Sequence, residues 1–426
     1  MSTQNNSTAS EKGEQSNEKE LPIALTGDPY LEPPNGGVQA WLQILGSFFL
    51  FFNSWGIVNA FGAFQSYYET SLLHDESSSN VSWIGAIQAF LLLIIGVITG
   101  PLYDSGYFYF LLLTGSSLIV LGFMTLSACT AYWQVLLAQA FCIGLGNGCL
   151  YIPAVAIIPQ YFSTRRPIAT AIAASGSSFG GVIYPIVFRR LQPQIGFGWA
   201  TRVLGFLALA TTLCSIAVMR VRQTSQKKRV LTEISAFREI PYTLFCTAMF
   251  CGYIGFFIPI FYIEQYAIAK NAIPGTFSPF YLVSILNAAS IPGRIVPGLL
   301  ARRISPLTIL MWSALISGLL SLCWTAIHNA GGLIAFAVLY GFFSGAFVSL
   351  PAVALTTLTP NLDTLGTRMG MCSMLCGLGS LCGSPVAGAI LDNTRSYLGV
   401  QLYSGLTIGA TGFILYCANA VRKRSA

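Results

Sequence analysis

Arg294 is a single cation inside an otherwise apolar stretch, SIPGRIVPGLL, at residues 290–300. A guanidinium is a planar fork of N–H donors that matches a carboxylate or another acceptor-rich group. A basic pair, Arg302 and Arg303, follows about eight residues later, which is roughly 12 Å along a helix. If the stretch spans a membrane, burying Arg294 costs at least ~2.5–3.5 kcal/mol, so a cavity or a partner is expected beside it. Arg294 is therefore a candidate substrate-binding residue, and the alternative is an anchor that reaches the membrane interface or braces helix ends.

Glu264 is the second ionisable candidate, in the segment FYIEQYA near the end of another apolar stretch. A carboxyl group that a cavity shields from water can hold a proton, which is what a proton-coupling residue has to do. The alternative is a solvated residue at the membrane rim, and the nearby Lys270 favours this alternative. Glu264 is thus a candidate for proton coupling, with the solvated interpretation preferred.

Single amide, hydroxyl and phenol groups elsewhere in the apolar stretches are further candidates for a binding cavity. Asn59, Asn287 and Ser290 are expected to contact the substrate, and Tyr151 and Tyr340 are candidates for lining a pocket around a ring-bearing ligand. The alternative for such groups is a hydrogen bond between helices, which contributes about 0.6 kcal/mol on average.

The residue types and their spacing do not indicate a catalytic site or a metal site. The two histidines, His74 and His328, stand apart, and most of the 11 cysteines lie in apolar stretches without paired spacing. Such thiols are expected to pack between helices. No P-loop motif is present, which argues against ATP-driven pumping. We therefore expect no enzyme activity, no metal and no cofactor.

Long apolar segments hold these candidate residues. Hydrophobic residues make up 54% of the 426 residues and charged residues only 9%, against roughly 25% charged residues in a soluble globular domain. Residues 41–68 and 83–103 carry no charge, and each run exceeds the about 20 residues that a helix needs to cross a bilayer. The composition predicts an all-α integral membrane protein.

Twelve transmembrane helices are predicted after a polar tail that lacks apolar periodicity. Counted over both tails and the loops, 16 of the 22 Lys and Arg residues fall on the same side as the N-terminus, so both termini are expected in the cytoplasm. The plasma membrane is the expected location, with an internal membrane such as the vacuole as the alternative. The predicted spans are residues 41–66, 83–102, 108–128, 133–158, 167–188, 199–219, 241–268, 277–299, 306–327, 332–358, 368–390 and 399–420.

A weak repeat indicates two related halves of six helices. GPLYDSG follows the second span and GLLARRIS follows the eighth, while SGSSFGGVIYP in the fifth is echoed by GLGSLCGSP in the eleventh. The small residues let helix backbones approach closely, and two related halves with a site between them are typical of transporters. The predicted divisions are a tail at 1–34, an N-terminal half at 35–219, a cytoplasmic linker at 220–240, a C-terminal half at 241–421 and a cytoplasmic C-terminus at 422–426.

Four motifs in this order resemble the major facilitator superfamily and, within it, the monocarboxylate-transporter family, especially its fungal branch. They are NGGVQAWLQILGSFFLFFNSWGIVNAFG at the first span, the GPLYDSG loop, YFSTRRPIATAIAASGSSFGG and IGFGWATR. The resemblance covers the chain from about residue 34 to its end, with Asn35 where many members have Asp. It implies the major facilitator fold, with two pseudo-symmetric halves of six helices, and a proton-linked carrier.

The resemblance also implies roles for individual residues. Animal members of the family use an Asp–Arg pair on the eighth helix and a Lys on the first. Arg294 matches the arginine, whereas Ser290 stands at the place of the acid and Asn59 at about the place of the lysine. The chain thus keeps one of the three charges, which weakens the case for lactate-type proton symport.

Asp104 occupies the acidic position of the superfamily loop GPLYDSG. The resemblance implies a conformational switch in which this acid caps or pairs with neighbouring helix ends. Arg165 and Arg166 are its expected partners, and a merely solvated loop acid is the alternative.

The sequence therefore predicts a secondary transporter of a small organic acid or acceptor-rich metabolite, with protons as a candidate coupling ion. Efflux of a fungal secondary metabolite is the alternative. A nutrient sensor is a weaker rival, because the tail and the linker are short for signalling, and the two-half organisation argues against a passive channel. The expected partners are a small-molecule substrate and the lipid bilayer, without nucleic acid, and an ancillary subunit is left open.

Overall fold

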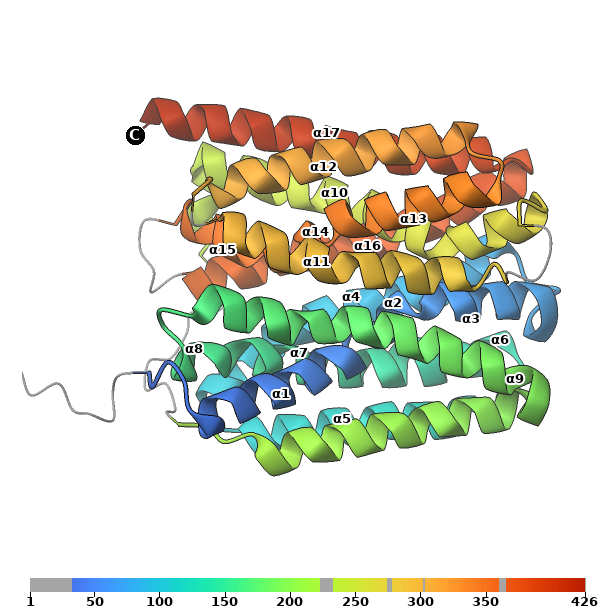
Figure 1. Cartoon of the computed structure of the whole chain (residues 1–426), viewed down its shortest axis with the longest axis horizontal. Coiled ribbons are helices and arrows are strands. Elements are labelled where there is room, and N and C mark those ends of the chain that lie inside the picture. The colour runs from blue at the N-terminus through green and yellow to red at the C-terminus, as the bar shows by residue number, and fades with distance from the viewer. Residues whose placement is uncertain (1–32, 223–232, 274–277, 302, 360–364, 426) are drawn as a thin grey trace, which may run out of the picture. The chain divides into compact units, whose positions relative to one another are not determined.

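The computed structural model of the chain describes residues 33–222, 233–273, 278–301, 303–359 and 365–425 (Figure 1). Residues 1–32 of the predicted tail, residues 223–232 of the predicted linker and Arg302 lie outside the described residues. Every regular element in the described ranges is a helix. The all-α prediction is therefore confirmed for this part of the chain.

Eleven helical segments in the described ranges are long and apolar enough to cross a membrane. Several of them consist of consecutive shorter helices. In the first half of the chain the helices are α1 (Val38–Asn53), α2 (Trp55–Asn59), α3 (Phe61–Tyr67), η1 (Tyr68–Leu72), α4 (Ser78–Asp104), α5 (Phe108–Leu126), α6 (Tyr132–Val135), η2 (Leu136–Ile143), α7 (Gly144–Ala156), α8 (Ile158–Tyr161) and α9 (Arg166–Val218). In the second half they are η3 (Ile234–Arg238), α10 (Ile240–Ala269), α11 (Tyr281–Leu300), α12 (Pro306–Cys323), η4 (Trp324–Ala326), α13 (Ala330–Ser344), α14 (Ala346–Ser349), α15 (Pro351–Thr356), α16 (Leu365–Thr394) and α17 (Tyr397–Ser425).

The helix α9 contains two of the predicted spans. It has 53 residues and would extend about 80 Å if straight, whereas the hydrocarbon core is about 30 Å thick. At Gly196 the backbone has φ 77° and ψ 168°, a conformation that glycine adopts without a steric penalty. The chain reverses there, so that a green arm and a lime-green arm run in opposite directions (Figure 1). The eleven apolar segments thus account for the twelve predicted transmembrane helices, and the twelve-helix prediction is confirmed.

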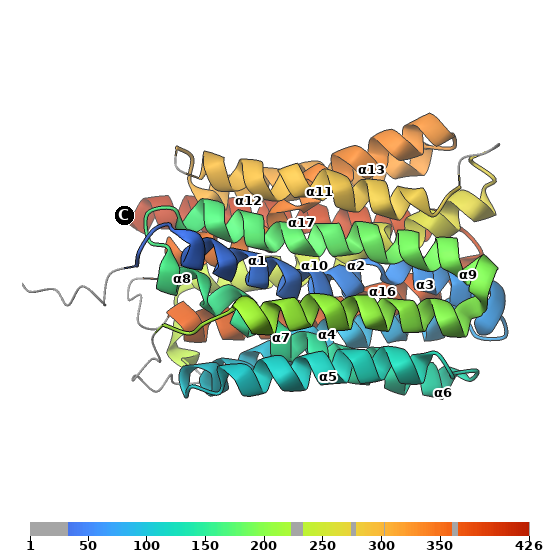
Figure 2. The same cartoon turned by 60° about the horizontal axis from the view of Figure 1, so that its bottom comes forward.

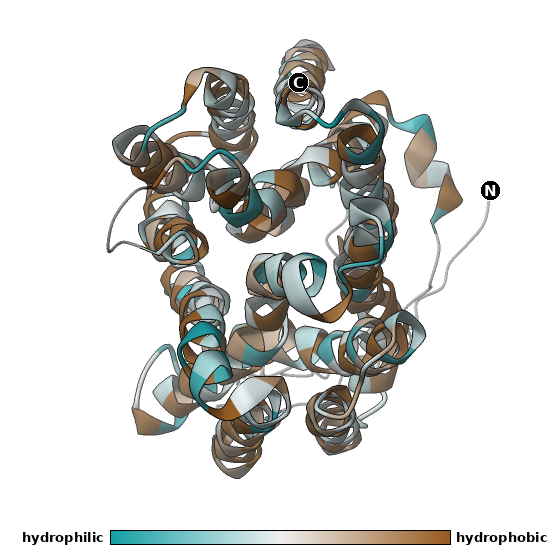
Figure 3. Cartoon of the chain, turned by 90° about the vertical axis from the view of Figure 1, so that its right-hand side faces the viewer, coloured by the Kyte–Doolittle hydropathy of each residue, from teal (hydrophilic) through white to brown (hydrophobic). Residues whose placement is uncertain are grey.

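Three pairs of helices make the main contacts between the N-terminal part of the chain (α1–α9) and its C-terminal part (α10–α17) in the described residues. The helix α4 packs along α16, α3 packs against α10, and the first arm of α9 packs against α11. Figures 1 and 2 show this arm of α9 beside α11, and Figure 3 shows the helices end-on. These helix pairs therefore hold the two parts of the chain together.

Small residues allow the close approaches that the Gly/Ser-rich motifs predict. A Cβ atom on Gly56 would lie 2.8 Å from the Cα atom of Gly180, so α2 and α9 touch through their backbones. A Cβ atom on Gly388 would lie 2.7 Å from the Cα atom of Ser79, which holds α16 against the start of α4. Larger residues at either glycine would push these helices apart.

The two ends of the helical body are named by the helices that begin or end there. The proximal end is the end at which α1 begins and α17 ends, and the distal end is the end at which α9 reverses at Gly196 (Figure 1). The helices α4 and α11 begin at the distal end, whereas α10 and α16 begin at the proximal end (Figure 1). These two names locate the candidate sites described next.

Candidate functional site

A small central cavity lies between side chains from both parts of the chain. Its volume is about 60 Å³. Residues from α2, α4 and α7 form one side, and residues from α10, α14, α15 and α16 form the other. The lining residues are Trp55, Leu93, Tyr151, Phe245, Met249, Tyr253, Phe347, Val348, Pro351, Ala352, Leu355, Met369, Cys372, Ser373 and Cys376.

Aromatic rings dominate the chemistry of the central cavity. The ring of Trp55 meets that of Tyr151 edge-on, with centroids 6.0 Å apart, and lies nearly parallel to Phe257, at 6.3 Å. Offset and edge-to-face ring contacts each contribute about 0.5–1.5 kcal/mol beyond the burial of area. Methionine and cysteine add polarizable sulfur that adapts to irregular shapes and contacts ring edges. This lining offers ring faces, ring edges and sulfur as apolar contacts.

Arg294 is buried at the interface between α11 and α9, with only 2% of its surface exposed. It donates hydrogen bonds to the carbonyl oxygen of Ala174, at 2.7 Å, and to Ser177 Oγ. Its Nε atom makes no hydrogen bond to the described residues, and the guanidinium lies within electrostatic range of the Tyr253 hydroxyl. A side chain with this burial does not reach the membrane interface, so that part of the anchor interpretation is wrong. The hydrogen bond to Ala174 joins α11 to the interior of α9 rather than to a helix end.

Two other predicted residues lie on the same face of α11 as Arg294. Ser290 donates to the carbonyl oxygen of Asn287 at 2.7 Å and exchanges a 2.7 Å hydrogen bond with Ser178 on α9. Asn287 donates to its own helix at Val283. Asn287, Ser290 and Arg294 thus form a polar strip between α11 and α9, next to the central cavity rather than in its lining.

The other residues predicted to contact the ligand lie in different parts of the structure. Tyr151 lines the central cavity. Tyr340 on α13 is fully buried and donates to the carbonyl oxygen of Phe256 at 2.9 Å. Asn59 is 3% exposed at the end of α2 and does not line the central cavity. Tyr151 is therefore the predicted residue that the structure places directly in this cavity.

The distal end is closed by an ion pair between the two parts of the chain. Glu264 on α10 accepts a hydrogen bond from Arg189 on α9, and the Glu264 side chain is 2% exposed against 16% for Arg189. The expectation that Glu264 is solvated at the membrane rim is therefore wrong. Its carboxylate is shielded from water and pairs with Arg189. An ion pair this buried attracts strongly, because little water screens it.

Further polar contacts join the two parts of the chain at the distal end. Gln265, beside Glu264, donates to Glu69 on η1. The hydroxyls of Ser82 and Tyr262 share a 2.5 Å hydrogen bond between α4 and α10. The ion pair Arg189–Glu264 and these two contacts are called the distal latch below.

Asp392 near the end of α16 strengthens the closure of the distal end. Its carboxylate accepts hydrogen bonds from the backbone N–H groups of Ser78 and Ser79, at 3.2 and 3.0 Å. These groups belong to the first turn of α4, whose N–H groups lack partners within the helix and attract a negative charge. The end of α16 is thereby fastened to the start of α4.

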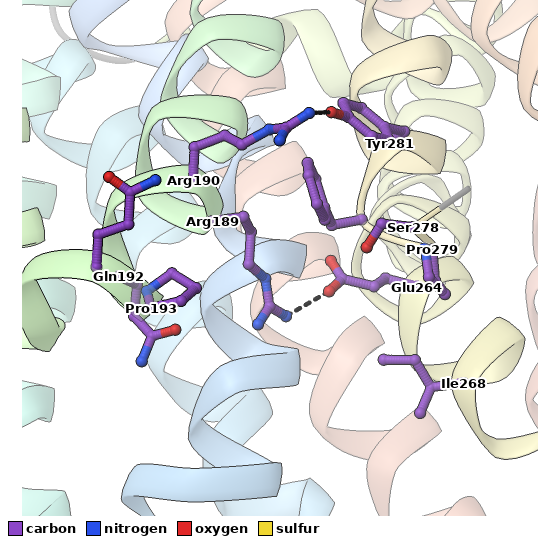
Figure 4. Close-up of a pocket in the computed structure, with 11 residues that line it drawn as sticks. Arg189, Arg190, Gln192, Pro193, Glu264, Ile268, Ser278, Pro279 and Tyr281 are labelled. Atoms are coloured by element: carbon purple, nitrogen blue, oxygen red, sulfur yellow. Dashed lines mark hydrogen bonds and ion pairs between the residues drawn. The ribbon is translucent and has the colours of Figure 1, made fainter. Parts of the chain in front are cut away.

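A second hollow, of about 510 Å³, lies at the distal end beside the latch (Figure 4). Arg189 and Arg190 on α9 face Glu264 and Tyr281 across it, and the figure shows both hydrogen-bonded pairs. This hollow is larger than the central cavity, and charged side chains contribute to its lining. It lies at the rim of the interface, apart from the rings of the central cavity.

The predicted switch residues gather near the proximal end. Asp104 ends α4 and is 7% exposed, whereas Arg165 and Arg166 are exposed at the start of α9. A 3.0 Å hydrogen bond from Gln160 to the Tyr103 hydroxyl holds the end of α8 near the end of α4. The pairing of Asp104 with either arginine stays a prediction.

Arg368 is a buried cation that sequence reasoning did not single out. It is 4% exposed at the start of α16 and makes paired hydrogen bonds to Glu239, at 2.6 and 2.7 Å, and to Glu233, at 3.1 Å. The guanidinium also stacks over the ring of Tyr242. The signal that the sequence offered was the two acids that flank η3, Glu233 and Glu239, because buried arginines need anionic partners. Among the described residues, no group of three His, Cys, Asp or Glu side chains can hold a metal ion.

A sequence profile described as Major Facilitator Superfamily matches residues 44–332. The chain is 48% identical over 386 residues to the MFS-type transporter dbaD of Emericella nidulans, covering 90% of this chain and 87% of that protein. It is 36% identical over 373 residues to the Agnestins efflux protein AgnL12 of Paecilomyces divaricatus, covering 87% and 85% of the two chains.

Two further comparisons agree. The chain is 34% identical over 401 residues to the Aspyridones efflux protein apdF of Emericella nidulans, covering 94% of this chain and 81% of that protein. The crystal structure of the fucose:proton symporter of E. coli matches with a TM-score of 0.61 and 18% sequence identity, over 89% of this chain and 98% of that one, which supports the fold. With this fold, this profile match and these relatives, the chain belongs to the major facilitator superfamily and is a membrane transporter.

Proposed function

We propose that the transporter exports an aromatic, acceptor-rich small molecule by alternating access. The observation that carries this proposal is the central cavity, which aromatic and sulfur side chains from both parts of the chain line. A site between two halves that open in turn is the plan of secondary transporters. In this proposal the closed distal latch marks the conformation that receives substrate from the proximal side.

The cavity must widen to hold a substrate. Ligand sites usually measure about 300–1,000 Å³, and the present 60 Å³ is far below that range. Met249 and Met369 are unbranched and can change rotamer at low cost, which makes them suitable gatekeepers. Trp55, Tyr151 and Tyr253 would then present ring faces and edges to the substrate.

Arg294 supplies the charge in this proposal. Its unpartnered Nε–H suits a carboxylate or a phenolate that arrives next to the rings. Asn287 and Ser290, along the same face of α11, would follow it into the site when α11 separates from α9. Asn59 and Tyr340 do not line the present cavity, so a role for them in binding requires the distal-open state.

The relatives support export over uptake. Two of them are named as efflux proteins, and each aligns over at least 87% of this chain. Export out of the cell requires the plasma membrane, with the proximal end in the cytoplasm, and the basic residues favour that orientation. The substrate we propose is therefore a secondary metabolite that the cell itself makes.

Proton-linked uptake of a small organic acid, as in the monocarboxylate-transporter family, is the second candidate function. Arg294 favours it as the anion-binding group, and the buried Glu264 favours it as the proton-coupling group. In that case Glu264 would take up a proton when the ion pair with Arg189 opens. Asp104 with Arg165 or Arg166 would act as the switch at the proximal end in either function.

Everted plasma-membrane vesicles from a heterologous yeast test the proposed export. The vesicles are incubated with an organic extract of the native host, and their contents are identified by mass spectrometry. Vesicles with the wild-type chain are expected to accumulate one or a few aromatic compounds. The variant Trp55→Ala is expected to accumulate about tenfold less, because ring contacts to the substrate are lost.

A matched control separates loss of the cavity from loss of folding. Trp312 is 57% exposed on α12, so Trp312→Ala should transport like the wild type. Accumulation of no compound above vesicles without the protein would overturn the export proposal. Equal accumulation by Trp55→Ala and Trp312→Ala would remove the central cavity from the transport path.

A further inference from the structure

The distal hollow has the size of a small-molecule binding site. Its volume of about 510 Å³ falls within the roughly 300–1,000 Å³ of ligand sites. The end of the first arm of α9 forms one wall, and the end of α10 with the start of α11 forms the other (Figure 4). Both parts of the chain therefore contribute to it, as in a site on a transport path.

Cations outnumber anions in the lining of this hollow. Arg189 and Arg190 face a single carboxylate, that of Glu264. The guanidinium of Arg190 is exposed, donates to the Tyr281 hydroxyl and lies 5.7 Å from the centre of the Tyr281 ring. The remaining polar lining side chains, Gln192, Gln194 and Ser278, are neutral. The hollow is therefore expected to attract an anion.

Buried hydrogen-bonding groups at the floor of the hollow lack partners. Arg189 Nε and Glu264 Oε2 make no hydrogen bond to the described residues, and the Glu264 side chain is 2% exposed. Such groups are uncommon in folded proteins, and a missing ligand is one explanation for them. An anion that enters would compete with Glu264 for the guanidinium of Arg189.

The rings beside these charges point to the rest of the ligand. Phe280 and Tyr281 line the hollow next to Arg190, and their ring centroids are 4.2 Å apart. An aromatic acid can place its ring against them while its anionic group meets a guanidinium. The polar floor and the aromatic wall together select a ring that carries a negative charge.

We propose that the distal hollow is a second binding site, which holds the carboxylate or phenolate of an aromatic molecule between the central cavity and release. Binding there draws Arg189 away from Glu264 and so loosens the distal latch. The identity of the natural ligand rests on the proposed export function, whereas the existence of the site does not.

Calorimetry on the purified full-length chain in lipid nanodiscs tests the site, with salicylate as the probe. The wild type is expected to bind two salicylate ions per chain. In Arg190→Gln the distal site is expected to bind about fivefold more weakly, because an exposed charge contributes up to roughly 1 kcal/mol. Trp55→Ala should lose central binding and keep distal binding.

Two controls make the result specific. Arg202 lies on the other arm of α9, where it donates to Ser127 and stacks on Trp199, so Arg202→Gln should bind like the wild type. Salicyl alcohol has the same ring without the carboxylate and should bind the distal site much more weakly than salicylate.

Three results would overturn the proposal: no salicylate binding that Trp55→Ala retains, equal binding by Arg190→Gln and Arg202→Gln, or equal affinity for salicyl alcohol. Binding in the distal hollow without export in the vesicles would contradict the proposed function and leave the site intact. Export without any binding in the distal hollow would contradict this inference alone.

Discussion

Replacing Glu264 by glutamine removes the negative half of the distal ion pair and keeps the shape of the side chain. Arg189 would then stay at the interface between α9 and α10 without a counter-charge. Removing one partner of a fully buried pair costs about 3–5 kcal/mol, mostly because the other charge is left uncompensated. The Arg189 side chain is 16% exposed and can turn partly to water, so about 2–3 kcal/mol is a better value here.

This free energy applies to the distal-closed state, because the two residues lie on different parts of the chain. A loss of about 2–3 kcal/mol shifts the equilibrium towards the distal-open state by roughly 30- to 150-fold, at about 1.4 kcal/mol per factor of ten. The double variant Arg189→Gln/Glu264→Gln has no unpaired charge at the interface. It is expected to return most of the way to the wild-type equilibrium.

Hydrogen exchange measured by mass spectrometry reports this shift without labels. In Glu264→Gln the amides of η1 and of the last turns of α10 should exchange faster than in the wild type, while those of α12 should not change. Arg202→Gln serves as the control for loss of an arginine at the same end of the molecule. Unchanged exchange in Glu264→Gln, or a double variant more open than either single variant, would refute the assignment of the latch.

Three other predictions follow from single residues. Arg294→Ala should insert normally but lose at least about 90% of transport. Arg294→Lys should recover little, because one ammonium group cannot replace the planar guanidinium with its several N–H donors. Vesicle uptake measures both variants, and full activity in Arg294→Ala would exclude substrate contact. Arg368→Ala should lower thermal stability by about 2–4 kcal/mol, since it removes the paired hydrogen bonds to Glu239 and those to Glu233. A melting temperature equal to that of the wild type would contradict this. Gly196→Ala should cost about 1–2 kcal/mol, because alanine is strained at a φ of 77°; the same melt, with Gly409→Ala as the control, checks it.

The helical architecture could be predicted because each span carries its own signal. Apolar length and flanking charge placed the twelve spans, and the structure differs mainly in joining two of them through Gly196. The motif SGSSFGGVIYP predicted a close approach, which Gly180 makes against Gly56. A run of small residues on one helix indicates a close approach even where the sequence does not identify the partner helix.

The candidate site was harder to predict because its contacts join distant parts of the chain. The pattern around Glu264 indicated a solvated acid beside Lys270, but its partner Arg189 lies 75 residues away in sequence. Trp55 and Tyr253 were hidden among many aromatic residues, of which the sequence has 29 Phe and 19 Tyr. Arg294 could be singled out because a lone charge in an apolar stretch is rare, whereas a ring in such a stretch is common.

The most direct test of the account compares the metabolites of native-host cells and their medium with and without the gene. The account predicts that the deletion strain retains one ring-bearing, acceptor-rich compound inside its cells. Release of that compound should return with the wild-type gene and not with the Trp55→Ala variant. If instead no compound is retained and a nutrient acid stays unused in the medium, the chain is an importer and the export account is contradicted.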